Sequence, residues 1–152
     1  MKRGTHNRRG EFNQFDLVHG FAFERLPSGA GGFVEAKAIR AMLRRYPDGH
    51  LESHASESWL PLAPSLKEVN HSPTGFEWGY GGSGPHQLAF AILLDLGFEA
   101  GTCHRLYAEF CRQLIASAPR GNWCITDRFV REWVNQQLAR RAEKEATTTA
   151  TV

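Results

Sequence analysis

A glycine-rich stretch followed by an apolar run constrains the fold of this chain more than any other feature. Four glycines fall within Gly79–Gly84, and glycine permits positive φ angles and close approach of the backbone to other atoms. Pro85 suits the first position of a helix, where its missing N–H is no loss, and this places the N-cap at Ser83 or Gly84. Every residue of Leu88–Leu94 is apolar, so the helix that follows is predicted to lie in the protein core.

The length and composition indicate one globular domain. The 152 residues are enough to bury a core, and the apolar share of 41% and the charged share of 22% are ordinary. No apolar run approaches the roughly 20 residues that a membrane-spanning helix needs, and no apolar signal segment follows the basic start. We therefore expect a cytoplasmic protein with no membrane partner, whose three cysteines are buried and reduced.

The first half of the chain is predicted to supply the sheet. Residues 1–13 are rich in Arg, Gly, Asn and Thr and are expected to form a disordered basic arm. Apolar residues alternate along Phe15–Arg25, which favours a strand with a bulge at Gly20. Glu35–Tyr46 carries apolar residues at helical spacing and is predicted to be an amphipathic helix. The competing interpretation is a second strand over Gly32–Ile39, paired with the first.

The second half is predicted to be helical. Gly97 would end the core helix, and Thr102–Ala118 repeats apolar residues at helical spacing, which predicts a second helix antiparallel to the first. Thr126 or Asp127 would cap a third helix, with Phe129 on its apolar face.

These segments amount to an α+β fold, in which a small antiparallel sheet from the N-terminal part is packed by roughly three C-terminal helices. Ser58–Leu62 is expected to be an edge strand, because Pro61 is tolerated there and not in a central strand. The single α+β domain is predicted to span residues 14–140 and to end in a frayed tail over 141–152.

The residues around the glycine-rich stretch also carry a family resemblance. Asn70–Pro85 reads NHSPTGFEWGYGGSGP and is followed, after one residue, by Gln87-Leu88-Ala89. This segment resembles the signature of an uncharacterised family of small proteins that is known as a domain of unknown function. The resemblance runs from about Ser58 to Trp133. It implies a setting in bacterial, plasmid and phage genomes, and it implies no activity or cofactor.

The glycine-rich stretch has two interpretations. Backbone N–H groups at a helix start can bind a phosphate. However, the stretch lacks the Lys-Ser/Thr ending of a P-loop and the strand and acidic partner of a dinucleotide-binding motif. The favoured interpretation is that the glycines let Trp78 and Tyr80 pack beneath the helix start.

Polar and aromatic side chains near this stretch are candidates for contact with a ligand or partner. His71 and His86 flank it, and a histidine at a helix N-terminus can act as a neutral acid or base. No Ser or Cys has the spacing of a nucleophile elbow, so the sequence assigns no catalytic residue and no cofactor. The candidates are Asn70, His71, Trp78, Tyr80, Ser83, His86 and Gln87.

One segment has the spacing of a metal site. His50, Glu52 and His54 alternate along the chain and would share one face of a strand, which is an arrangement that can bind Zn²⁺. The segment is polar and lies outside the region of resemblance. We therefore expect a surface loop here, and no metal.

The sequence favours a non-catalytic accessory or interaction protein of a mobile genetic element that binds another protein. One form would be an inhibitor of a host defence system. The first alternative is a small nucleotide-binding protein or enzyme that uses the glycine-rich loop with His71 and His86. The second is a DNA- or RNA-binding protein, because Lys2, Arg3, Arg8 and Arg9 crowd the N-terminus and basic arms can bind phosphates. The oligomeric state stays open.

Overall fold

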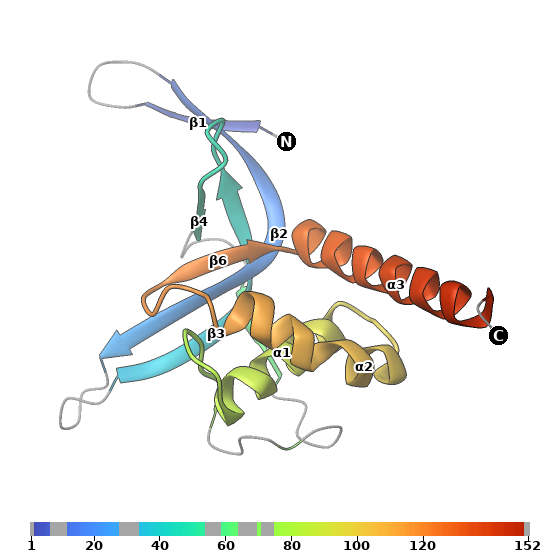
Figure 1. The fold of residues 1–152 in the computed structure, drawn as a ribbon. Helices are drawn as coiled ribbons and strands as arrows, with labels where there is room; N and C mark the ends of the chain where they lie inside the picture. Colours follow the sequence, from blue (N-terminus) through green and yellow to red (C-terminus); the bar gives the residue numbers. More distant parts are fainter. Residues whose placement is uncertain are drawn as a thin grey trace.

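The fold is a curved antiparallel sheet with helices packed on one end of it (Figure 1). The computed structural model describes residues 2–6, 12–27, 34–53, 59–63, 70 and 75–150. Within these residues, the sheet has six strands, five from the N-terminal part and one from a later segment, and three α-helices lie toward the C-terminus. The predicted α+β class is confirmed.

A long two-stranded ribbon forms the centre of the sheet. β2 (Phe12–Pro27) pairs with β3 (Val34–Arg45) in an unbroken antiparallel register, from Asp16 opposite Arg45 to Pro27 opposite Val34. The helix predicted for Glu35–Tyr46 is therefore wrong, and the competing strand is nearer the structure.

The misleading helical pattern of β3 has a physical cause. Both faces of this strand are buried: Ala38 packs under the helices, whereas Ile39, Ala41 and Leu43 belong to a second apolar cluster. A strand that is covered on both faces loses the alternation of apolar and polar residues that identifies a half-exposed strand.

Gly20 allows two strands to approach each other and does not form the predicted bulge. The β2–β3 register continues through it without an extra residue. A Cβ atom at this position would lie 2.4 Å from the carbonyl oxygen of Ile125 and 2.4 Å from Cδ1 of Leu43. The absence of a side chain thus permits the neighbouring strand to pack against β2.

Four shorter strands complete the sheet. β1 (Lys2–His6) and β6 (Trp123–Thr126) pair with successive parts of β2, and β4 (Leu51–Ser53) and β5 (Trp59–Pro61) pair with β3. β5 confirms the strand predicted around Pro61.

The predicted disordered arm over residues 1–13 differs from the structure where the chain is described. Lys2–His6 forms a strand, and β2 already includes Phe12 and Asn13. Backbone hydrogen bonds to β2 can order this segment even though it has almost no apolar side chains. The remaining positions of the arm lie outside the described residues.

α1 (Ser83–Asp95) is the core helix predicted from the sequence. All of Leu88–Leu93 is buried, between the sheet on one side and α2 (Ala100–Phe110) on the other. Gly97 has φ of 88° and donates from its N–H to the carbonyl of Leu94, so it ends α1 as expected. α2 continues into a π-helical turn, Cys111–Ile115. The two together correspond to the predicted second helix.

α3 (Asp127–Ala150) starts at the end of β6 and leaves the body of the protein (Figure 1). The Thr126 hydroxyl accepts a hydrogen bond from the N–H of Phe129 at 3.1 Å, which confirms the predicted cap. The segment for which a frayed tail is predicted is helical as far as Ala150. Strong helix formers occupy most positions of residues 138–146, which supports the helix without tertiary contacts.

Arg40 of β3 connects the sheet to two helices. Its Nε lies 3.1 Å from Oδ2 of Asp95 at the end of α1, and its Nη2 donates to Oδ2 of Asp127 at the start of α3 at 2.9 Å. One guanidinium therefore fixes where α1 ends and α3 begins relative to β3.

Candidate functional site

The loop before α1 packs its main aromatic side chain into the core. Trp78 has 0% exposed surface, and its indole N–H donates to the carbonyl of Gly121 at 3.0 Å. The ring lies 5.7 Å from that of Phe23, centroid to centroid. Trp78, a candidate contact residue in the sequence, is thus a core residue.

Arg25 of β2 holds this loop against the turn before β6. Its Nη2 forms an ion pair with Oε2 of Glu77 at 2.8 Å and donates to the carbonyl of Trp78 at 3.2 Å. Its backbone N–H donates to Oδ1 of Asn122 at 2.8 Å, and its Nε donates to the carbonyl of Arg120. Side chain and backbone of one arginine therefore connect three segments.

Two glycines of the loop are required by close packing. Gly79 has φ of 83° and donates from its N–H to the carbonyl of Ile115 at 2.9 Å. At Gly84, a Cβ atom would lie 2.8 Å from Cβ of Glu77. These contacts agree with the structural interpretation of the glycines for Trp78, because no side chain fits where the loop meets its neighbours. The same interpretation is wrong for Tyr80, which is 46% exposed and not packed beneath the helix start.

The start of α1 differs in detail from the prediction. The N-cap is Gly82, no side chain caps the helix, and Pro85 is the third helical residue, where its missing N–H is equally harmless. Ser83 is exposed and contributes no cap.

His86 lies partly at the surface, whereas its neighbour Gln87 lies in the core. His86 is half-buried, and its Nδ1 lies 2.7 Å from the carbonyl oxygen of Gly82. Since a carbonyl only accepts, this nitrogen carries the proton and donates. The imidazole also meets the edge of Tyr107, at 6.1 Å between centroids. Gln87 has 0% exposed surface, so an incoming ligand does not reach it in this conformation.

The remaining sequence candidates do not assemble with these side chains. Tyr80 is 46% exposed and Asn70 is exposed, whereas His71 lies outside the described residues. Among the described candidates, Trp78 and Gln87 are buried whereas Asn70, Tyr80 and Ser83 are exposed, so the described candidates do not all share one open site.

Two of the basic N-terminal candidates, Lys2 and Arg3, lie at the far end of the ribbon. Lys2 is opposite Asp16 in the sheet, Asp16 is opposite Arg45, and Arg3 is next to Lys2 on β1. Arg8 and Arg9 lie outside the described residues.

The alternating His50–Glu52 segment forms an ion-pair chain. His50 Nδ1 lies 2.5 Å from Oδ1 of Asp48 and its Nε2 lies 3.5 Å from Oε1 of Glu52, whose other oxygen accepts from the Tyr46 hydroxyl. The hydrogen bond to Asp48 raises the pKa of His50, and hydrogen bonds from the backbone N–H and then the imidazole of His50 lower the pKa of Asp48. His54 lies outside the described residues, and within them no group of three or more His, Cys, Asp or Glu side chains is arranged to hold a metal ion.

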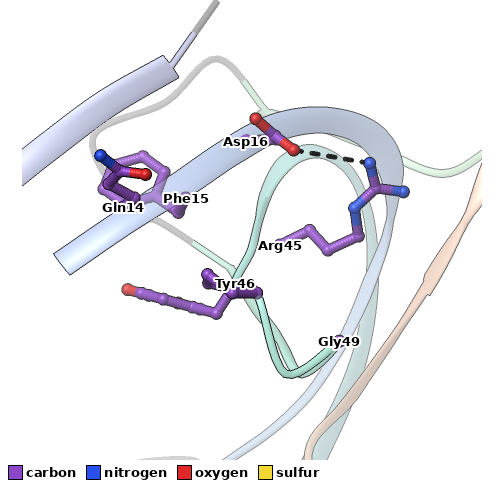
Figure 2. A pocket seen from close by; sticks show the side chains of 7 residues that line it. Gln14, Phe15, Asp16, Arg45, Tyr46 and Gly49 are labelled. Carbon is purple, nitrogen blue, oxygen red and sulfur yellow. Dashed lines mark ion pairs between the residues drawn. The ribbon is translucent and has the colours of Figure 1, made fainter.

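A hollow of about 540 Å³ at the ribbon end was not predicted from the sequence (Figure 2). Tyr46 packs against Phe15 with ring centroids 5.7 Å apart, and Asp16 and Arg45 form an ion pair at 3.7 Å beside it. The residues that line the hollow come from two separate segments, 14–16 and 45–49, and the pairing of β2 with β3 brings these segments together.

An apolar groove lies beside β6. It has a volume of about 310 Å³, and all four residues of β6 line it together with Leu51 of β4, Leu114 and Ala118 after α2, and Phe129 of α3. Phe129 is 48% exposed, although the helical spacing placed it on the apolar face of its helix. Phe129 does lie on the apolar face of α3, but it borders the open groove, so no other side chain among the described residues fully covers it.

A second hollow of about 310 Å³ adjoins the groove and is acidic. It shares Leu51, Trp123 and Cys124 with the groove and adds Glu24 and Glu52. Burial raises the pKa of the Cys124 thiol to about 11, and the charges of both carboxylates act in the same direction. The negative charge of this hollow therefore reaches the groove.

Comparison with known proteins gives a family and no activity. The chain belongs to a family of unknown function (DUF6166), whose model matches residues 44–136. This range includes the segment in which the sequence showed its resemblance. The chain has no significant match among curated proteins or among solved structures. None of the described helices combines the length and the apolar character needed to cross a membrane.

Proposed function

We propose that this chain is a non-catalytic interaction protein that binds another protein through the apolar groove beside β6. The observation that carries this proposal is the half-exposed Phe129 above a groove with apolar walls. Aromatic side chains at the mouth of an apolar hollow are typical anchors of protein interfaces. The residues of the groove all fall within the range that the family model matches.

The biological setting is part of the same proposal. The resemblance of the Asn70–Pro85 segment supports an origin in a mobile genetic element, for which a useful small product is an inhibitor of a host defence system. Such an inhibitor needs only a surface that covers a functional part of its target. A groove without catalytic side chains is sufficient for that role.

The enzyme alternative has less support. It requires His71, Trp78 and His86 to meet at an open pocket, and Trp78 is fully buried beneath Arg25. The proton on Nδ1 of His86 is committed to the carbonyl of Gly82. These contacts favour a structural role for the loop, in which it braces α1 against the sheet.

The nucleic-acid alternative draws support from one arrangement. The register places Lys2 opposite Asp16 and Asp16 opposite Arg45, so a residue of the basic N-terminus lies in line with an arginine that lines the hollow at the ribbon end. If this end binds nucleic acid, affinity for single-stranded DNA should fall steeply with salt and should drop in Arg45→Gln. Lys144→Gln, on the exposed part of α3, is the control.

The protein-binding proposal is tested by affinity capture from a lysate of the natural host with a matched pair of variants. Phe129→Glu places a charge at the groove and completes a Thr126-x-x-Glu capping box, so α3 should remain folded. Tyr80→Glu changes an aromatic side chain of similar exposure on another part of the surface. We expect a stoichiometric partner with the wild type and with Tyr80→Glu, and its loss with Phe129→Glu. Equal capture by all three proteins would contradict the groove as the binding site.

A further inference from the structure

The outer edge of β6 is a strand edge without a hydrogen-bonded neighbour among the described residues. β6 pairs with β2 on one side only, from Gly20 opposite Thr126 to Phe23 opposite Trp123. β4 comes near β6 but is not paired with it, and the groove extends along all four β6 residues. An open edge presents backbone N–H and C=O groups to which an extended peptide can add.

The groove offers space for side chains of such a peptide. Leu114 and Ala118 form one wall, and Phe129 stands over it from the first turn of α3. In an added strand, every second side chain points to the same face. One apolar side chain of the peptide would thus enter the groove, while its neighbours in the sequence point away.

The acidic hollow defines the charge of the partner. Glu24 accepts a hydrogen bond from the Ser53 hydroxyl at 3.2 Å, and Glu52 accepts one from the Tyr46 hydroxyl at 2.9 Å. These hydrogen bonds orient the two carboxylates. Glu52 also lies 3.5 Å from Nε2 of His50, so protonated His50 offsets part of its negative charge, and a basic partner competes with this imidazole for Glu52. A lysine or arginine of the partner is the complementary group at this end of the groove.

The buried indole N–H of Trp123 is a further group that can bind the peptide backbone. Trp123 lines both the groove and the acidic hollow, and its buried indole N–H has no hydrogen-bond partner in the part of the chain that the structure describes. A buried donor of this kind is uncommon and destabilising. A carbonyl of a bound peptide backbone, reached after a small shift of the surrounding side chains, would satisfy it.

We infer that the groove takes an extended, basic segment of a partner protein, which adds to the edge of β6, places an apolar side chain against Phe129 and directs a basic side chain to Glu24 and Glu52. This inference rests on the proposed protein-binding function and specifies the chemistry of the partner. It identifies β6 as the recognition strand and the two glutamates as the source of charge selectivity.

The test is selection from a displayed library of random peptides on the full-length protein. Selected peptides should contain a lysine or arginine near an apolar residue, and they should lose binding to Phe129→Glu. Affinity should fall about tenfold in Glu24→Gln/Glu52→Gln, in line with the loss of a close charge contact. Because Gln retains the hydrogen-bond acceptor for Ser53 and Tyr46, this double variant should fold as the wild type does.

Backbone exchange supplies the second measurement. On addition of a selected peptide, the amides of Trp123–Thr126 that face away from β2 should exchange more slowly with solvent, which a contact through side chains alone would not produce. Peptides without basic residues, equal affinity for the double glutamine variant, unchanged exchange in β6, or no selected peptide would each overturn the inference. Affinity capture that depends on Phe129 would in those cases still support the proposed function, with a partner of another shape, such as a helix.

Discussion

The guanidinium of Arg25 lies over the ring of Trp78, with 4.4 Å between its carbon and the ring centroid, and it also donates to the carbonyl of the same residue. This pair joins β2 to the loop before α1. Because Trp78 is buried and donates to Gly121, the loop is held from both sides. The glycine-rich segment thus contributes Trp78 to the core, and the apolar groove lies elsewhere, beside β6.

Removal of the Trp78 side chain should destabilise the whole domain. Trp78→Ala is expected to lower the free energy of unfolding by about 3–5 kcal/mol, the usual loss for a buried aromatic residue. Trp78→Phe retains most of the apolar volume and should lose about 1 kcal/mol with the hydrogen bond to Gly121. Urea denaturation of both variants measures the difference. A stable Trp78→Ala protein with lost partner binding would instead show that Trp78 acts in recognition.

Arg25→Lys separates the charge of Arg25 from its shape. Lysine keeps a positive charge near Glu77 but cannot lie flat over Trp78 while it donates to two segments. We expect a loss of about 1–2 kcal/mol in unfolding free energy, since hydrogen bonds and a cation–π contact are removed. Equal stability of Arg25→Lys and wild type in the same denaturation experiment would mean that the ion pair alone fixes the loop.

The contact of β6 with β2 depends on the absence of a side chain at Gly20. Gly20→Ala would place a methyl group 2.4 Å from the Ile125 carbonyl oxygen, so β6 must move or separate from β2. We expect a loss of about 1–3 kcal/mol, as for other overpacked sites. Gly81→Ala is the control, because a Cβ atom there meets nothing within 4 Å. Thermal unfolding that shifts equally in both variants would contradict this role of Gly20.

The sequence predicts those parts of the fold in which local pattern and tertiary environment agree. The core helix around Leu88–Leu94, the stop at Gly97 and the cap at Thr126 are all local features, and all three are present. β3 was misassigned because both of its faces are buried, so its apolar residues do not alternate.

The candidate site was beyond sequence analysis for a different reason. The groove combines Leu51, Leu114, Trp123 and Phe129, which lie in four separate elements, and only the fold brings them together. Conversely, the glycine-rich stretch attracted functional candidates because its composition is unusual. The unusual composition reflects tight packing of the loop against Glu77 and Arg120.

His50 provides a pH-dependent contribution that can be measured directly. The hydrogen bond to Asp48 raises the pKa of His50 above the 6.5 of an unperturbed histidine, and the partner Asp48 has a lowered pKa. A raised folded-state pKa means that the stabilisation by protonated His50 is fully present below pH 6.5 and is lost as pH rises through the folded-state value. In an NMR titration, the midpoint of His50 should lie above 6.5 and should fall in Asp48→Asn. A midpoint that is unchanged in this variant would exclude the Asp48 contact in solution.

The cysteines should resist alkylation in the native protein, and the groove makes one of them a reporter. Burial raises the pKa of both Cys111 and Cys124 to about 11, and it also raises that of Cys103. Only the thiolate reacts rapidly, so native protein at pH 8 should be labelled by iodoacetamide far more slowly than protein in denaturant.

Glu24→Gln/Glu52→Gln removes two negative charges that act on Cys124 and should accelerate labelling of this cysteine while Cys103 and Cys111 stay unchanged. Mass spectrometry of the labelled peptides resolves the three sites. An unchanged rate at Cys124 would show that the field of the acidic hollow does not extend into the groove, and it would remove the electrostatic basis for selection of a basic partner.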